Sequence, residues 1–464
     1  MDRRFETGRP ERPLWPLIVI PLLCIVLLAT ATFLLSKTSL SPETRQPGKS
    51  LLTASHLPFA PVLKKDTEPQ NAARLYMTAL VKGQYATMWS LLAPQIQAQW
   101  PGEASYASFW QARYHDYILE GFSIGNASAL SQWVDPETMA AYDHVDRMPV
   151  SLQLQPDQAL LQQGQLPPED RHPEEVLKNL PFIVEPVSGA KATQPHWLVL
   201  DGGPGDPEAP ILPPLRPTDK IVQVPILMYH HVSDAPSPNA LIESLTVTPT
   251  MFKQQLDYLQ QQDYHTITFN QLFDALYFGA PLPVRPIILT FDDGYADVYH
   301  FALPLLQQHH FTATFYIISG KVGWQGYMDW GNLQDLLRKG MQIGSHTVHH
   351  VDVGVAYLDS PALAQAELQQ SKAKLEKQLG VVIQQFCYPS GEPFRSESVT
   401  LQQAIVALLW QDGYIGATTD PGRTGIDQNS QTPFDLLRIR VDGRETFDEF
   451  VYSLPWQRSD QPGN

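Results

Sequence analysis

The stretch Pro286-Ile287-Ile288-Leu289-Thr290-Phe291-Asp292-Asp293-Gly294 joins an almost wholly apolar run to two adjacent aspartates. The apolar run predicts a buried strand of a parallel sheet, so the aspartates fall where the strand ends and a loop opens. Adjacent side chains of an extended chain point opposite ways, and Gly294 permits a turn. We therefore expect one aspartate to bind a metal ion and the other to exchange protons. Taken alone, the pair is more simply a turn or a helix cap.

Three histidines follow a second strand-like segment, residues 341–345, some fifty positions later: His346, His349 and His350. His346 and His350 are spaced i and i+4, which predicts one face of a helical turn and a shared cation. A solvated polar stretch is the simpler interpretation of these histidines alone. Because the aspartates and the histidines each follow a strand, the two motifs together favour a metal-dependent hydrolase.

Composition limits the classes of protein that remain. The 464 residues suffice for two or three domains with proper cores. Lys+Arg 32 against Asp+Glu 48 gives a net charge of −16, which argues against a general nucleic-acid binder. The two cysteines, Cys24 and Cys387, lie far apart and exclude both a disulfide framework and a cysteine-rich zinc site. Any metal ion must therefore use nitrogen and oxygen ligands.

The N-terminal region predicts a membrane anchor. Residues 14–35 carry no charge and are long enough to cross a bilayer as a helix, so we assign an anchor to residues 14–36. Four arginines precede this segment, which predicts that residues 1–13 are cytoplasmic and that the rest of the chain is extracytoplasmic, in a single-pass protein of the cell membrane. A signal peptide cleaved near Thr32 is the alternative.

Proline-rich segments predict the domain boundaries. Residues 37–66 form a tether, residues 67–200 an α+β domain, residues 201–220 a linker rich in proline and glycine, residues 221–456 a second domain, and residues 457–464 a tail. In the α+β domain the pattern predicts a helix over 71–81, another from Met88, and strands at 150–154 and 197–200. This order is similar to that of the nuclear-transport-factor-2-like family. Four of its aromatic residues would line a pocket or, more simply, belong to the core: Tyr106, Trp110, Tyr114 and Tyr117.

The second domain alternates strands and helices. Strands are predicted over 222–229, 286–291, 312–317, 384–388, 414–417 and 437–441, with helices over 251–262, 298–308, 362–379 and 399–411. Such alternation implies an α/β fold with a parallel barrel or a wound sheet.

These motifs resemble those of the polysaccharide deacetylase family, carbohydrate esterase family 4, over roughly the C-terminal half of the chain. The resemblance implies an irregular β/α barrel with Asp292 as catalytic base. By the same resemblance Asp293, His346 and His350 hold one divalent metal ion, zinc with nickel or cobalt as alternatives. His349 has no counterpart in the family's motif and ranks below His350.

Three further residues follow from the resemblance. Residues 224–230 are similar to the opening of the poly-N-acetylglucosamine deacetylase branch, which implies that His230 is a general acid; a packed or solvated histidine is the alternative. Residues 386–391 resemble the family's third motif, in which the backbone N–H of Ser390 would help to hold the oxyanion. Cys387 occupies a position where many members have arginine, so Arg438, ahead of Arg440, is the expected partner of Asp292. Both arginines would otherwise be surface charges on an edge strand, and Cys387 is expected to be small core packing.

The implied activity is metal-dependent hydrolysis of the linear amide C–N bond of an N-acetylated polysaccharide outside the membrane. The expected partners are this glycan and, through the N-terminal helix, the membrane, with no nucleic acid. Two alternatives remain at the level of the sequence: another metal-dependent ester or amide hydrolase, and a non-catalytic glycan-binding scaffold.

Overall fold

The computed structural model describes residues 68–159, 173–187, 197–213, 215–235, 239–420 and 425–456. The predicted cytoplasmic segment, membrane anchor, tether and tail lie outside these residues, so the structure does not test these four predictions. Within the described ranges, no helix combines the length and the apolar character that crossing a bilayer requires.

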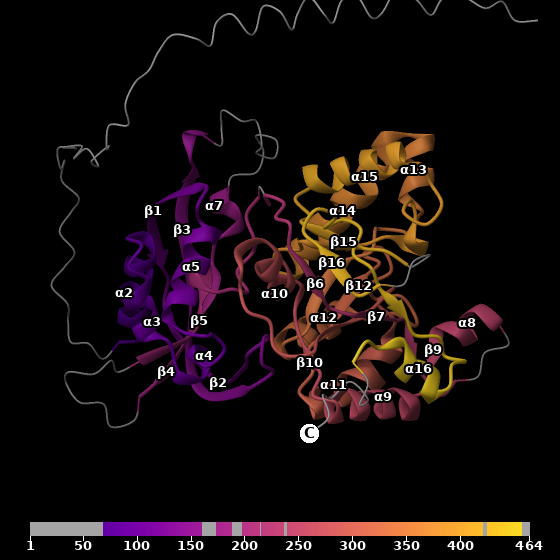
Figure 1. The fold of residues 1–464 in the computed structure, drawn as a ribbon, viewed down its shortest axis with the longest axis horizontal. Helices are drawn as coiled ribbons and strands as arrows, with labels where there is room; N and C mark the ends of the chain where they lie inside the picture. Colours follow the sequence, from indigo (N-terminus) through magenta and orange to yellow (C-terminus); the bar gives the residue numbers. More distant parts are fainter. Residues whose placement is uncertain are drawn as a thin grey trace, which may run out of the picture. The chain divides into compact units, whose positions relative to one another are not determined.

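The first domain consists of helices followed by an antiparallel sheet (Figure 1). Its helices are α2 (Pro69–Val81), α3 (Tyr85–Leu91), α4 (Pro94–Gln97), α5 (Glu103–Arg113) and the short α7 (Pro173–Val176). Its strands are β1 (Tyr117–Ile124), β2 (Ser128–Val134), β3 (Ala141–Pro156), β4 (Leu180–Pro186) and β5 (Trp197–Gly202). The sheet order is β1-β3-β4-β5, and β2 pairs with β3. The helix predicted over 71–81 and the strand predicted at 197–200 are both present.

Aromatic side chains form much of the core of this domain. Trp110 is fully buried and packs against Phe109 and Tyr114, with ring centroids 4.9 and 5.9 Å away. Tyr117 is buried as well, whereas Tyr106 also lines a recess described below. The core interpretation therefore holds for all four aromatic residues that the sequence singled out, and Tyr106 lines the recess as well.

The segment that follows β5 packs against both domains. After the 3-10 turn η1 (Gly203–Gly205), the carbonyl oxygens of Pro207 and Ala209 accept hydrogen bonds from the Arg113 guanidinium. The backbone of Ile211 exchanges two hydrogen bonds with the side chain of Gln384, at 2.8 and 2.7 Å. This proline-rich segment is therefore fastened along its length and does not act as a free spacer.

The second domain is built on a curled parallel sheet. Its order is β15-β14-β13-β12-β11-β7-β17, and β10 pairs with β11. The strands are β7 (Ile226–Tyr229), β10 (His265–Thr266), β11 (Pro286–Phe291), β12 (Thr314–Ile317), β13 (Gln342–Ser345), β14 (Gln385–Cys387), β15 (Gly416–Thr418) and β17 (Ile439–Arg440). Short pairs flank the sheet: β6 (Ile221–Gln223) with β16 (Asp427–Asn429), and β8 (His231–Val232) with β9 (Thr246–Val247). The predicted parallel sheet is thus confirmed.

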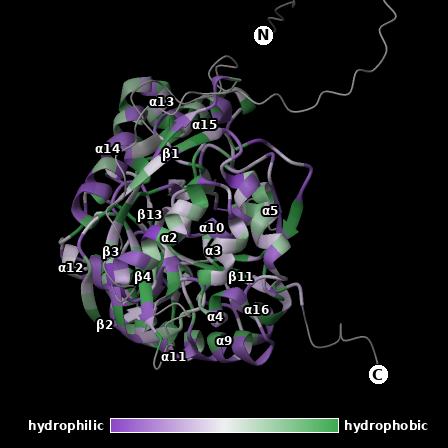
Figure 2. Ribbon diagram, turned by 90° about the vertical axis from the view of Figure 1, so that its left-hand side faces the viewer, coloured by the Kyte–Doolittle hydropathy of each residue, from purple (hydrophilic) through white to green (hydrophobic). Residues whose placement is uncertain are grey.

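Helices cover this sheet and carry both hydrophilic and hydrophobic residues (Figure 2). They are α8 (Ala240–Leu245), α9 (Pro249–Gln261), α10 (Phe269–Phe273), α11 (Leu303–His309), α12 (Trp330–Arg338), α13 (Val353–Asp359), α14 (Pro361–Leu379), α15 (Val399–Gln411) and α16 (Phe447–Ser453). In α9 the Thr248 side chain caps the first turn, and Phe252 and Leu256 are buried as the helical spacing predicts.

Strand β11 is the centre of the core. All six of its residues are buried, because β7 and β12 pair with it on its two sides. The ring of Phe291 stacks between those of Tyr229 and Phe315, at centroid distances of 5.3 and 4.9 Å. This packing fixes the point at which Asp292 and Asp293 leave the sheet.

Two predicted elements differ in detail from the structure. The strand predicted over 222–229 is two strands, β6 and β7, because Pro225 has no backbone N–H to donate to a ladder. The helix predicted over 298–308 begins as a π-helical turn, η3 (Val298–Ala302), and continues as α11. Pro304 lies at that junction, where its ring disfavours a regular α-helical turn.

Candidate active site

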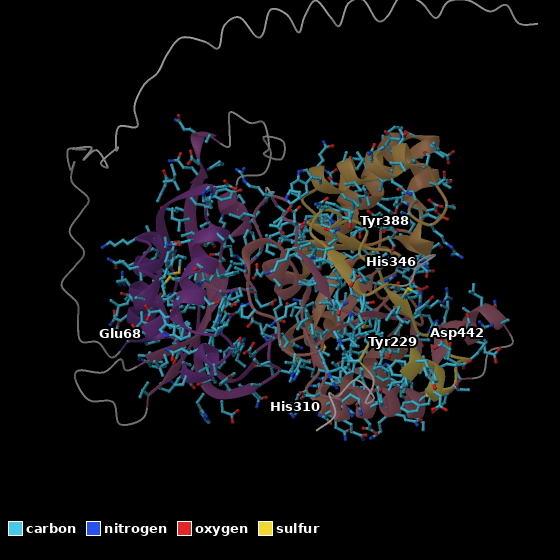
Figure 3. All side chains as sticks on the ribbon, viewed as in Figure 1. Glu68, Tyr229, His310, His346, Tyr388 and Asp442 are labelled. Atoms are coloured by element: carbon cyan, nitrogen blue, oxygen red, sulfur yellow. The ribbon has the colours of Figure 1, made fainter. Side chains whose placement is uncertain are left out.

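Polar side chains gather where the parallel strands end. His230 follows β7, Asp292 and Asp293 follow β11, His346 follows β13, and Cys387 is the last residue of β14. Neighbouring strands of a parallel sheet end at the same edge, so the fold brings these residues together although they are up to 157 positions apart in the sequence. Figure 3 shows His346 inside this domain, between the labelled Tyr388 and Tyr229.

Asp292 is held by a buried arginine. Arg438 is completely buried and donates two hydrogen bonds to the carboxylate, Nη1 to Oδ1 at 2.8 Å and Nη2 to Oδ2 at 2.9 Å. Its Nε donates to the carbonyl oxygen of Thr419 at 2.7 Å. Burial alone would raise the pKa of Asp292, but the Arg438 charge outweighs it and lowers that pKa below its ordinary value. Asp292 is therefore an ionised carboxylate with a fixed orientation.

Arg438, and not Arg440, contacts Asp292. The neighbouring Arg440 points elsewhere, with its Nη1 3.5 Å from Asp420 Oδ2. This agrees with the order in which the sequence ranked the two arginines.

Cys387 is a further neighbour of Asp292 that the sequence did not predict. Its thiol lies 3.4 Å from Asp292 Oδ2 and accepts a hydrogen bond from Arg438 Nη2 at 3.2 Å. The side chain is fully buried, as expected for core packing. Sequence spacing gives no signal for this contact, because it depends on how far β14 curls around toward β11.

Asp293, His346 and His350 form a group that fits a metal ion. Their ligand atoms all lie within 4.8 Å of one another. Asp293 Oδ1 is 3.4 Å from Nε2 of His346 and 3.2 Å from Nε2 of His350, and this buried oxygen has no hydrogen-bond partner. Two imidazole nitrogens and one carboxylate oxygen are a set that zinc accepts.

A hydrogen bond to the backbone orients the imidazole of His346. Its Nδ1 lies 2.8 Å from the carbonyl oxygen of Cys387. A carbonyl oxygen only accepts hydrogen bonds, so Nδ1 carries a proton and Nε2 is the nitrogen that faces Asp293. Burial alone would raise the pKa of Asp293, but contacts with His346 and His350 hold it well below the ordinary value. Asp293 is thus the ionised carboxylate that a metal ligand requires. Burial alone would lower the pKa of His346, but Cys387 and Asp293 raise it well above its ordinary value, so a cation bound at Nε2 would have to displace a proton.

The prediction that His346 and His350 share a helical turn is wrong. Residues 346–350 form a loop in which Thr347 and His350 have positive φ angles of 64° and 62°. The Thr347 hydroxyl accepts a hydrogen bond from the backbone N–H of His350 at 2.8 Å and closes this turn. The loop nevertheless brings the two imidazoles together, with ring centroids 4.9 Å apart.

His349 points away from this group. Its Nδ1 lies 2.6 Å from Glu367 Oε1 on α14, and its side chain is 70% exposed. The other oxygen of Glu367 accepts hydrogen bonds from the backbone N–H groups of Val348 and His349, at 2.9 and 3.0 Å. Glu367 therefore holds the loop that carries His350, a role that the sequence did not predict.

His230 faces the same carboxylate as Arg438. Its Nε2 is 3.9 Å from Asp292 Oδ2, and its side chain is 15% exposed. Burial lowers the pKa of His230, and the nearby charges of Asp292 and Asp293 raise it only in part. The ring is therefore neutral near pH 7.

Ser390 lies in the 3-10 turn η4 (Pro389–Gly391) directly after β14. Its φ angle is 58°, in the left-handed region, and the residue is exposed. It follows Cys387 by three residues, so its backbone leaves the sheet beside the edge that carries the other groups.

Two aromatic pairs lie beside the aspartates. The ring of Tyr295 stacks on that of His231 at 3.7 Å and lies 5.1 Å from that of Tyr327. His231 Nδ1 is 2.7 Å from Asp297 Oδ2. Of these residues, Tyr295 lies close to Asp293. Sequence periodicity does not predict them, because His231 belongs to the two-residue strand β8 and the tyrosines belong to loops.

The described chain matches known proteins over its second domain. The polysaccharide deacetylase family model matches residues 279–408. A Bacillus subtilis protein named as a polysaccharide deacetylase, YxkH, is 28% identical over 225 residues, which are 48% of this chain and 73% of that protein. The poly-β-1,6-N-acetyl-D-glucosamine N-deacetylase of Escherichia coli K12 is 29% identical over 87 residues, 19% of this chain and 12% of that protein.

A solved structure is similar over the same region. The deacetylase PplD of Streptococcus pyogenes, solved in complex with acetate, covers 51% of this chain and 100% of its own at 27% identity, with a TM-score of 0.44. The family match extends over both the aspartate pair and the three histidines. The chain therefore contains a polysaccharide deacetylase domain.

Proposed function

We propose that this protein is a metal-dependent deacetylase that removes N-acetyl groups from an N-acetylated, glucosamine-containing polysaccharide. The proposal rests on one observation: three candidate metal ligands lie directly beside an ionised carboxylate. The ligands are Asp293, His346 and His350, and the carboxylate is Asp292. A purely structural cluster of Asp293 with the two histidines would not require Asp292 beside it, held in a separate orientation.

The three ligands would hold one divalent cation, with zinc suited to nitrogen and oxygen donors and nickel or cobalt as alternatives. When bound, this cation would polarise the acetyl carbonyl as a Lewis acid. Asp292 accepts a proton from the water molecule that attacks the acetyl carbon. Arg438 keeps both carboxylate oxygens of Asp292 in one orientation during this transfer, because its guanidinium is fixed by Thr419.

We assign protonation of the leaving amine to His230. Since its pKa is lowered, the ring enters the reaction neutral and must first gain a proton. The nearest source is the carboxylic acid formed at Asp292, whose Oδ2 is 3.9 Å from Nε2. The C–N bond then breaks, giving acetate and a free amino sugar. The backbone N–H of Ser390 is assigned to the negative oxygen that forms on the acetyl carbon.

The proposed substrate class is supported by the relatives named above, one of which is named as a poly-β-1,6-N-acetyl-D-glucosamine N-deacetylase. A net charge of −16 favours a neutral polymer over a polyanion. An extracytoplasmic location, with residues 14–36 as a membrane anchor, remains part of the proposal and is supported by the uncharged run and the arginines before it.

Acetate release from β-linked N-acetylglucosamine oligomers tests the proposal. The metal-stripped protein should be inactive and regain activity with zinc. Asp292→Asn should keep its bound metal and lose about 10²-fold or more of its turnover, as expected for loss of a general base. Asp293→Asn should lose metal as well. Near-native turnover by Asp292→Asn would contradict this mechanism even if metal dependence were confirmed.

The same measurements separate the two alternatives. A different ester or amide hydrolase would need metal and Asp292 but would act on small acetyl esters and spare the glycan oligomers. A non-catalytic glycan-binding scaffold would release no acetate with any metal.

A further inference from the structure

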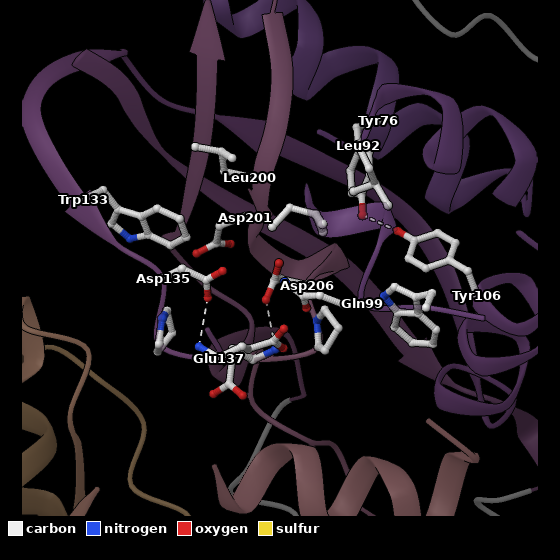
Figure 4. Close-up of a pocket in the computed structure, with 15 residues that line it drawn as sticks. Tyr76, Leu92, Gln99, Tyr106, Trp133, Asp135, Glu137, Leu200, Asp201 and Asp206 are labelled. Carbon is white, nitrogen blue, oxygen red and sulfur yellow. Dashed lines mark hydrogen bonds between the residues drawn. The ribbon is translucent and has the colours of Figure 1, made fainter. Parts of the chain in front are cut away.

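The first domain contains a recess lined by five carboxylates: Asp135, Glu137, Asp201, Asp206 and Glu208. In Figure 4 the side chains of Asp135, Asp201 and Asp206 lie between Trp133 and Tyr106. The recess has a volume of about 20 Å³, enough for one group the size of a water molecule. Among the described residues that line it there is no lysine, arginine or histidine.

Several of these carboxylates are satisfied by the backbone. Asp201 accepts from the N–H of Gly203 at 2.7 Å, and Asp206 accepts from Gly202 and Glu208, each at 3.0 Å. Such bonds hold the acidic side chains in place. They therefore build a fixed wall of carboxyl groups, whose pKa values burial raises.

Two buried polar atoms at this recess have no hydrogen-bond partner: Oε1 of Glu137 and Nε2 of Gln99. One is an acceptor and the other a donor, and buried polar groups in proteins are normally paired. Both residues also line a second, larger cavity together with Trp100 and Pro207. The unpaired atoms thus lie where the recess and the larger cavity meet, and they point to a ligand that both donates and accepts.

The larger cavity has a volume of about 560 Å³, within the range of small-molecule sites. Its walls carry the hydrogen-bonding side chains of Gln271, Thr266 and His265 as well as the indole of Trp100. An indole ring beside several polar side chains suits a sugar ring, which is apolar on its C–H faces and polar at its edge.

The recess gathers carboxyl groups whose ionised forms burial disfavours. Burial raises the pKa of Glu208 to about 8, that of Asp206 to about 6 and that of Glu137 well above its ordinary value, so a cation bound among them would stabilise their ionised forms. A bare metal ion is not the best fit. Among the described residues, His, Cys, Asp and Glu ligand atoms come close enough for a metal only in the groups that contain Asp292 or Asp293. Carboxylates that are more widely spaced suit an ammonium group, which donates three hydrogen bonds in different directions.

We propose that this recess binds the ammonium group of a 2-amino-2-deoxy sugar, with the sugar ring in the larger cavity beside Trp100. The inference rests on the proposed function, because such a sugar is the product of the deacetylation. Glu137 accepts from the ammonium group and Gln99 donates to a ring or hydroxyl oxygen. An N-acetylated sugar is excluded, since its amide carries no positive charge and its acetyl group exceeds the recess. The first domain would thereby retain chains that are already deacetylated.

Calorimetric titration of the full chain with a β-linked glucosamine tetramer tests this inference. We expect the tetramer to bind at least ten times more tightly than its N-acetylated counterpart and binding to weaken with salt. Glu137→Gln should weaken tetramer binding about tenfold or more, and Glu137→Lys, which places an ammonium group in the recess, should abolish it. Both variants should keep the acetate-release activity. Gln99→Met is a second, uncharged change that should also weaken binding.

Asp293→Asn separates this site from the proposed active site. Tetramer binding should be unchanged in that variant, and its loss would assign the binding to the second domain and overturn the inference. Equal affinity for the two tetramers, or wild-type affinity in Glu137→Gln, would overturn it as well. If the wild type released no acetate but still bound glucosamine selectively, the proposed function would fail and the recess would stand as an amino-sugar site.

Discussion

At the scale of single residues, the geometry of Asp292 depends on Arg438. A lysine would keep the positive charge but replace two parallel hydrogen bonds by a single point contact. We expect Arg438→Lys to reduce acetate release by at least tenfold with metal content unchanged. Arg440→Lys is the matched control, because Arg440 lies two positions away and contacts Asp420 instead. Turnover and metal stoichiometry of both variants decide the matter, and equal losses in the two would remove Arg438 from its assigned role.

The sequence could single out Asp292 and His346 because each directly follows a strand, and Asp293 and His350 because of their spacing from these two. Arg438 was more difficult to predict, since it precedes a strand of only two residues and its side chain could have faced solvent. Cys387 shows where spacing fails. Its contact with Asp292 joins residues 95 positions apart and depends on the curl of the sheet between β11 and β14.

At the scale of elements, the loop of residues 346–350 explains why two histidines spaced like a helical turn need no helix. The positive φ of Thr347 and His350 turns the backbone twice within four residues. Periodicity alone does not distinguish such a loop from a helical turn, because both bring positions i and i+4 to one side. The three predicted ligands therefore lie together, although the backbone between the two histidines is a loop and not a helical turn.

Glu367 on α14 is the external support of this loop. Removal of its carboxylate frees the backbone N–H groups of Val348 and His349 but takes away no proposed metal ligand. We expect Glu367→Ala to weaken zinc binding on the order of 10-fold, as found for outer partners of metal ligands. Gln370→Ala, an exposed position on the same helix, should leave the affinity unchanged. Competition with a chelating dye measures both affinities, and an unaffected Glu367→Ala would mean that the loop holds its shape alone.

At the scale of the whole molecule, a buried ion pair joins the two domains. Arg113 on α5 and Asp274 at the end of α10 lie 2.5 Å apart, and their side chains are 2% and 1% exposed. Arg113→Ala leaves an unpaired carboxylate in the interior, which typically costs about 3–5 kcal/mol. Arg216→Ala removes an exposed pair with Asp116 and should cost less than about 1 kcal/mol. Urea unfolding compares the two variants. Similar losses would show that the Arg113 pair is not a main connection between the domains.

The acidic recess should also make stability depend on pH. The folded-state pKa of Glu208 is raised to about 8, whereas an unfolded glutamate titrates near ~4.3. The folded protein therefore binds the extra proton between these values, so this contribution is complete at low pH and is lost as pH rises through about 8. Glu208→Gln is neutral at every pH and lacks that loss. We expect the urea midpoint of the wild type to fall relative to that of Glu208→Gln between pH 5 and pH 8, both measured without ligand. Parallel pH profiles of the two proteins would mean that Glu208 is ionised in the folded protein. A saturating glucosamine tetramer should reduce the fall of the wild-type urea midpoint with pH, because its ammonium group stabilises the ionised carboxylates.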